Sequence, residues 1–205
     1  MKKTASSPAP APAPRRRRTP DEVRADALAA ARAILIADGP QAITLKAVGD
    51  ALGMTHANLI HHFGSAAGLQ SELMRSMVED LSGALLALVD EVTAGRMTDR
   101  ALVDAVFDAF GAGGAGRLAA WIALSGDARS IDAFRPAVIA LAEAMAERHE
   151  GPRDELAAGF LLTALMALGD SLLGGFFRDV LRLPGDASRS LTAELMPGSG
   201  EAEGG

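Results

Sequence analysis

Two short helical runs separated by one glycine constrain the fold of this chain most strongly. Thr44 precedes the run 45–52 and Thr55 precedes the run 56–63. Each threonine suits a helix start, because its hydroxyl can accept a hydrogen bond from a free backbone N–H group. Gly53 supplies the left-handed backbone that a tight turn between two helices requires. The pattern predicts a helix-turn-helix unit, whose second helix can enter the major groove of DNA.

Helix signals continue on both sides of this unit. Thr19 begins a capping box and Gly39-Pro40 ends the helix that follows it. Ser65 begins a fourth helix, in which leucines at helical spacing continue to about residue 94. Further helices are expected near 99–110, 116–125, 133–150, 153–183 and 186–196. Alternating runs typical of strands are missing from the sequence, which predicts an all-α fold: a three-helix head joined by one long helix to a helical body.

The domain boundaries follow from changes in composition. Residues 1–18 are rich in Ala, Pro and Arg and predict a disordered tail, and 197–205 predict a frayed one. Between them we expect the head at 19–65 and the body at 66–196. The N-terminal stretch has no apolar segment typical of a secretory signal, and cysteine is absent. A cytoplasmic location is the expectation.

Charge is distributed unevenly along the chain, whose formal net charge is −6. Residues 1–62 carry nine Lys and Arg against five Asp and Glu, whereas the remainder carries 11 against 21. A basic head on an acidic body suggests that the head meets a polyanion. The run Arg15–Arg18 is either a solvated tail or an arm that contacts phosphate or the minor groove.

Three of the four histidines lie in the predicted second helix of the turn, at 56, 61 and 62. On a helix these positions point in three directions, whereas metal ligands on one helix converge at a spacing of three or four residues. We therefore expect no metal there. With Ala57 and Asn58 they form a short polar surface suited to base edges and phosphates.

At this point the sequence resembles a known family. Thr19–Leu73 is similar to the DNA-binding domain of the tetracycline-repressor (TetR) family of bacterial transcription regulators. The matching segments are Ala37-Asp38-Gly39, Ile43-Thr44-Leu45-Lys46, Gly53-Met54-Thr55, Leu59, His61-His62-Phe63-Gly64-Ser65 and Leu69. The resemblance implies that the head binds double-stranded palindromic operator DNA and that the body binds a small-molecule effector and forms a homodimer. A repressor released from DNA by its effector is the function it implies.

By the same resemblance, individual residues take roles on DNA. Thr44 contacts phosphate, Lys46 contacts a base or a phosphate, and His61 and His62 hold phosphate. The remaining DNA-binding positions are Thr55, His56, Ala57 and Asn58, of which the last three read bases. This chain departs from the family at two positions, with Ile60 where Tyr is usual and Ala66 where Lys is usual. The alternative function is a helical ligand-binding protein whose head has lost DNA binding.

The body carries a long apolar run at 156–177. Asp170 and several small residues interrupt it, so we expect a buried helix rather than a membrane span. The run predicts a homodimer held by the helices near 133–150 and 153–183. A mostly apolar effector is expected between the fourth helix and the helices that carry Phe107, Phe110 and Trp121. Its candidate contacts are Phe107, Phe110, Trp121, Phe134, Met145, Phe160 and Met166. Convergent carboxylates and nucleophile–base pairs are not evident, so neither an enzyme nor a cofactor is predicted.

Overall fold

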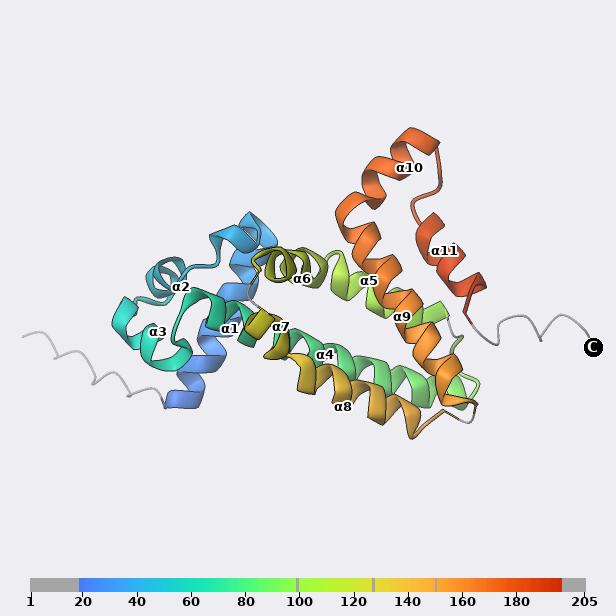
Figure 1. Cartoon of the computed structure of the whole chain (residues 1–205), viewed down its shortest axis with the longest axis horizontal. Coiled ribbons are helices and arrows are strands. Elements are labelled where there is room, and N and C mark those ends of the chain that lie inside the picture. The colour runs from blue at the N-terminus through green and yellow to red at the C-terminus, as the bar shows by residue number, and fades with distance from the viewer. Residues whose placement is uncertain (1–18, 99, 127, 150, 197–205) are drawn as a thin grey trace, which may run out of the picture.

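The structure, a computed structural model of the 205-residue chain, describes residues 19–98, 100–126, 128–149 and 151–196. Within these ranges every regular element is a helix, which confirms the predicted all-α class. Figure 1 shows the helical head at one end, a long helix leading away from it, and a helical body at the other end. The tails predicted at 1–18 and 197–205 lie outside the described residues.

The head begins with α1 (Pro20–Asp38), where Thr19 and Glu22 form the expected capping box. A short 3-10 turn, η1 (Pro40–Ala42), leads to α2 (Leu45–Leu52) and α3 (His56–Phe63). The bounds of α2 and α3 are those that the caps predict. Both predicted threonine caps are present: Thr44 accepts a hydrogen bond from the N–H of Ala47, and Thr55 accepts one from the N–H of Asn58.

One long helix joins the head to the body. This helix, α4 (Ala66–Thr93), has 28 residues and begins at the predicted cap, Ser65. At 1.5 Å per residue it is about 42 Å long. Its first turns pack on α1 and α3, and its later turns run beside α5 and α8 (Figure 1).

The body follows the predicted order of helices with three differences. It consists of α5 (Arg100–Phe110), α6 (Ala115–Leu124), α7 (Ala128–Asp132), α8 (Arg135–Ala146), α9 (Arg153–Gly169), η2 (Asp170–Gly174), α10 (Gly175–Leu181) and α11 (Ala187–Glu194). The short α7 is not predicted by the sequence. The helix expected at 133–150 is shorter because Pro136 lies in its first turn and it ends at Ala146. The third difference is η2, a π-helical turn inside the run expected as one regular helix.

The core of the head extends into the body. Leu35, Val48 and Leu59 are fully buried, and they belong to the same apolar cluster as Leu118 and Ile122 of α6. The packing is close at Gly114, before α6, where an added Cβ would lie 3.1 Å from the side chain of Leu35. Arg117 also donates a hydrogen bond to the carbonyl oxygen of Ile36. Helix α6 is therefore packed directly on the head.

One helix of the body, 153–181, is long and apolar enough to span a membrane by length and composition. Only 17% of its apolar window is buried, so the helix that the sequence predicts to be buried is largely exposed in the single chain. Its inner side packs on α5, α6 and α11. At the π turn Asp170 pairs with Arg178 and accepts a hydrogen bond from Ser188. The outward side is apolar and exposed, and it comprises Leu161, Leu165, Leu172, Leu173, Phe176, Phe177, Val180 and Leu181. We call these residues the outer apolar face.

Candidate functional site

The turn between α2 and α3 depends on two glycines. Gly53 has φ 64° and ψ 34°, the left-handed conformation that the sequence predicts. At Gly49 an added Cβ would lie 2.9 Å from the carbonyl oxygen of Met54, which is closer than real Cβ atoms approach. The amide of Met54 also donates a 2.8 Å hydrogen bond to the carbonyl oxygen of Gly49. The absence of a side chain at 49 therefore lets the chain fold back tightly and fixes the crossing of the two helices.

The residues predicted to contact DNA lie on the outside of this unit. Leu59 and Phe63 are buried beneath α3, which leaves the opposite side of the helix facing outwards. The exposed members of the predicted set are Thr44, Lys46, Thr55, His56, Ala57 and His61, and the half-buried members are Asn58 and His62. None of these eight residues, at the start of α2 and along α3, is buried, and we call them together the recognition surface.

The histidines occupy both ends of α3. His61 and His62 are adjacent in the last turn, with ring centroids 5.6 Å apart in an edge-on arrangement. His56 begins the helix at the opposite end. In the part of the chain that the structure describes, no group of three or more His, Asp or Glu side chains is placed to hold a metal ion. Imidazole N–H groups at these positions can instead donate hydrogen bonds to a polyanion.

Every lysine and arginine within residues 19–65 pairs with a carboxylate. Arg24 pairs with Glu72 at 2.7 Å and Arg32 pairs with Asp80 at 2.7 Å, so both connect α1 to α4. Lys46, the one such cation on the recognition surface, pairs with Asp50 one turn later on α2 at 2.5 Å. This pair is exposed, and pairs of this kind contribute only a few tenths of a kcal/mol, so a phosphate can compete with Asp50 for the lysine.

A charged cluster supports the end of α3. The guanidinium group of Arg24 stacks over the ring of Phe63 at 5.2 Å. Glu72 accepts hydrogen bonds from both Arg75 and Arg24. The hydrogen bond from Arg75, joined by that from Arg24, lowers the pKa of Glu72 to about 2 against the opposing effect of burial. The carboxylate is therefore firmly ionised and holds the two arginines together.

The two departures from the family pattern both lie at the end of the unit. Ile60 is 43% exposed on α3, so an apolar side chain faces solvent beside the recognition surface. Ala66 is half-buried as the first residue of α4. Neither side chain can donate a hydrogen bond to a phosphate.

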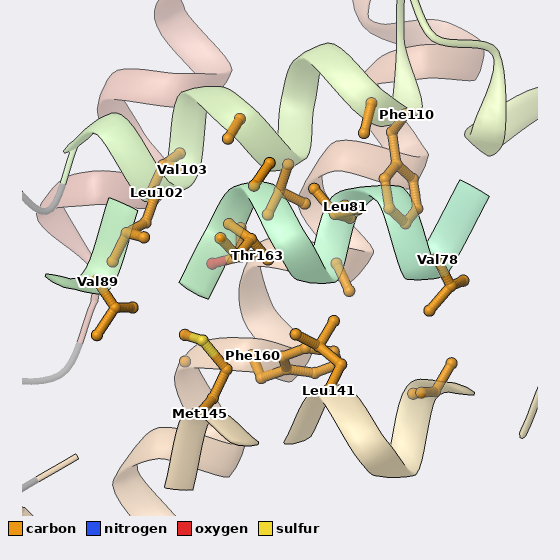
Figure 2. Close-up of a pocket in the computed structure, with 18 of the residues that line it drawn as sticks. Val78, Leu81, Val89, Leu102, Val103, Phe110, Leu141, Met145, Phe160 and Thr163 are labelled. Carbon is orange, nitrogen blue, oxygen red and sulfur yellow. The ribbon is translucent and has the colours of Figure 1, made fainter. Parts of the chain in front are cut away.

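The second site is a cavity of about 640 Å³ in the body. Its walls come mainly from α4, α5, α8 and α9, with a smaller part from α6, and Figure 2 shows side chains from the first four helices pointing into one space. The sticks drawn there are almost entirely carbon, with the sulfur of Met145 and the hydroxyl of Thr163 among them. Such a space suits a mostly apolar ligand.

Four of the seven predicted ligand-binding residues line this cavity: Phe110, Phe134, Met145 and Phe160. The other three do not. Phe107 is buried in a neighbouring cluster with Val103 and Ala167, beneath the guanidinium group of Arg189. Met166 packs against that same cluster. Trp121 is 42% exposed on α6, outside the walls of the cavity.

The cavity also has a wall on α4, the helix beside which the effector is expected from the sequence, although no residue of this wall is among the seven candidates. Its residues are Met74, Met77, Val78, Leu81, Ala84, Leu85, Val89, Val92 and Thr93. This row follows one side of the helix at intervals of three and four residues, a signal that the sequence contains. The same spacing describes an ordinary packed helix, so it does not by itself indicate a ligand site.

Comparison with known proteins gives two matches. Residues 27–73 match the family model described as bacterial regulatory proteins, tetR family. The HTH-type transcriptional repressor KstR2 of Rhodococcus jostii (strain RHA1) is 30% identical to this chain over 89 residues. That alignment covers 43% of this chain and 44% of the relative, so it spans less than half of the length of either protein.

Proposed function

Because its N-terminal head makes this chain a member of the tetR family of bacterial regulatory proteins, we propose that it is a ligand-responsive transcriptional repressor. In this proposal a homodimer binds palindromic operator DNA through its two heads. A small, mostly apolar effector enters the body and releases the dimer from the DNA.

One observation carries the link between effector and DNA: the cavity and the core of the head share residues. Met74 and Met77 of α4 are buried in the apolar cluster of the head, and both line the cavity. Ala115 of α6 has the same two roles. A ligand that displaces these side chains must shift α4 or α6 against α1, because a packed core has little free volume to absorb the change. Such a shift moves α3 relative to the partner's α3.

On the DNA, the recognition surface divides into two parts. We assign base contacts to His56, Ala57 and Asn58, at the start of α3, where residues of a recognition helix usually reach base edges. His61 and His62 lie one turn later and face the backbone phosphates. Thr44, Lys46 and Thr55 lie at the starts of α2 and α3, where backbone N–H groups also favour an anion.

The outer apolar face supports the proposed homodimer. Its eight members lie on α9, η2 and α10, and each is 47% exposed or more in the single chain. Monomeric proteins rarely expose so large a contiguous apolar patch. A second copy that packs its own α9 and α10 on this face would cover it and would set the distance between the two α3 helices. Operator half-sites are then expected about one helical turn of DNA apart, roughly 34–36 Å.

The alternative function has its own support. Lys46 is paired with Asp50, and Ile60 occupies an exposed position beside the recognition surface. Because every lysine and arginine within 19–65 is paired with a carboxylate, the head offers little unpaired positive charge to DNA. Such a head fits a ligand-binding protein that no longer binds DNA.

Sequencing of the DNA fragments that co-purify with the protein tests the two functions against each other. Repressor function predicts enrichment of a palindrome, a footprint over it, and binding that weakens steeply with salt. Release of the protein from that palindrome by an apolar compound that fills the cavity would support the proposed response to an effector. Fragments without a shared sequence, and no protected site in a footprint, would favour the alternative. A protected palindrome whose footprint does not change with the four substitutions His56→Ala, Asn58→Ala, His61→Ala and His62→Ala would mean that DNA is read elsewhere on the protein.

A further inference from the structure

Charged residues lie at the rim of the cavity, and its interior is almost entirely apolar. Its charged lining residues are Arg32, Asp80, Arg148, His149 and Glu155, and the side chains of all five are at least one-third exposed at its rim. The interior contains one polar side chain among the described lining residues that is buried, Thr163, which is 6% exposed. An ionised ligand group would lose its hydration in this interior without a charged partner, which is costly.

Thr163 donates its hydrogen bond to a weak acceptor. The hydroxyl lies 3.3 Å from the thioether sulfur of Met196, which stands two residues after the end of α11 and also lines the cavity. A thioether accepts hydrogen bonds poorly compared with a carbonyl or ether oxygen. Thr163 is therefore a buried donor that a ligand oxygen can satisfy better than Met196 does.

The dimensions of the cavity restrict the shape of its occupant. Its wall on α4 extends from Met74 to Thr93, which is about 28 Å at 1.5 Å per residue. Its volume of about 640 Å³ is within the range of pockets that hold small organic ligands. A molecule that lies along this wall is elongated.

We propose that the cavity binds an elongated, uncharged lipophile with an oxygen acceptor part-way along its length, and that Thr163 selects it by transferring its hydrogen bond from Met196 to that oxygen. The inference deepens the proposed function, because it names the chemical class of the effector. Binding itself does not depend on whether the head binds DNA.

Two probes of equal size test the selection. Heptadecan-9-one and n-octadecane each have 18 non-hydrogen atoms, and both can be delivered from cyclodextrin to compete with the apolar fluorophore N-phenyl-1-naphthylamine. The measurement is the ratio of the affinity for the ketone to the affinity for the alkane, so differences in the solubility of the probes cancel between variants. Thr163→Val removes the hydroxyl at nearly constant shape and should lower this ratio by about 2- to 10-fold, the effect of one hydrogen bond.

Two further variants complete the test. Met196→Leu removes the competing acceptor and should raise the ratio, because the hydroxyl then lacks its partner until the ketone binds. Thr93→Val changes an exposed threonine at the rim and should leave the ratio unchanged. If Thr163→Val does not fold, the affinity ratio is compared between two other variants. Thr163→Ser keeps the hydroxyl and its acceptor, and Met196→Leu keeps the hydroxyl without its acceptor.

The outcomes separate this inference from the proposed function. Equal ratios in the unaltered protein and in Thr163→Val would overturn the inference, as would a failure of both probes to displace the fluorophore. Neither result involves DNA. A protein that selects the ketone through Thr163 but binds no operator would overturn the repressor function and leave the ligand class intact.

Discussion

The guanidinium group of Arg24 donates a 2.9 Å hydrogen bond to the backbone carbonyl oxygen of His62, in the last turn of α3. The last carbonyl groups of a helix have no partner within it and carry partial negative charge, so a cation at this position stabilises the helix end. A second nitrogen of Arg24 binds Glu72 of α4. Helix α3 is thus held to α1 and α4 at its C-terminal end.

Glu72→Gln should lower the free energy of unfolding at pH 7 by about 2 kcal/mol, because it removes the charge that two arginines share. The pKa of Glu72 is about 2 in the folded protein and 4.5 ordinarily. Its contribution is therefore present above pH 4.5 and is lost as the pH falls through 2. Denaturant titrations between pH 7 and 2 should show the two proteins converging on the acid side.

The matched control for this prediction is Glu79→Gln. Glu79 pairs with the same Arg75 but is 53% exposed, so its removal should cost less than about 0.5 kcal/mol. A control that destabilises the protein as much as Glu72→Gln would mean that the cluster has no special role in holding α3.

Asn58→Ala should reduce discrimination at one base position by roughly 1–3 kcal/mol, whereas His62→Ala should weaken binding to all sequences alike. The reason is that Asn58 lies at the start of α3 and His62 in its last turn. Binding to a set of operators with single base changes distinguishes the two patterns. A uniform loss of affinity with Asn58→Ala would place base reading elsewhere.

Asp50→Asn should increase the affinity for DNA. The change releases Lys46 from its ion pair, and the free lysine can neutralise a phosphate. The slope of log affinity against log salt should steepen by up to about 0.9 for each additional phosphate that is neutralised. Lys46→Gln is the opposite control and should flatten the slope. An unchanged slope in both variants would show that Lys46 does not reach the DNA.

Deletion of residues 1–18 should also flatten the salt dependence. The deleted segment contains Arg15–Arg18, while the three cations within 19–65 are all paired with carboxylates. Each phosphate that the shortened protein no longer neutralises should reduce the slope by up to about 0.9. Substituting only the four arginines by glutamine should reproduce the effect of the deletion. An unchanged slope would indicate that the arginines remain in solvent.

Leu165→Glu should convert the proposed dimer to a folded monomer. Leu165 is 58% exposed in the single chain, so a carboxylate is tolerated there until a second copy covers it. Sedimentation at micromolar concentration, with circular dichroism to confirm folding, provides the measurement. Leu124→Glu changes an 87% exposed leucine on α6 and should leave the assembly intact. A monomeric unaltered protein would contradict the prediction directly.

The helix bounds of the head could be predicted because their signals are local. The residues that line the cavity could be predicted only in part. The bounds of α2 and α3 follow from Thr44, Gly53 and Thr55, which act within a few residues of their own positions. The direction in which a body helix faces depends instead on how it crosses its neighbours. On α5, Phe110 lines the cavity as well as packing on the cluster of Phe107, whereas Phe107, three residues earlier, is buried in that cluster and does not reach the cavity.

The size of a side chain was also a poor guide to whether it lines the cavity. Large side chains are the ligand-binding candidates that a sequence offers, but a space for a ligand forms where small ones leave room, as at Ala84, Gly159 and Ala164. The π turn at 170–174 depends on one extra residue within a helix and has no signal in apolar periodicity. Asp170, which interrupts the apolar run, marks where it begins.

The burial of Leu118 and Ile122 in the core of the head limits how this protein can be recombined with its relatives. A chimaera that joins its first 65 residues to a foreign body would leave Leu35 and Val48 facing side chains that did not evolve against them. The smallest portable unit includes α6 or a matched replacement for it. Exchanging heads between such regulators therefore also exchanges the contact between the head and α6. Hybrid proteins should fold only where the transferred segment keeps that contact.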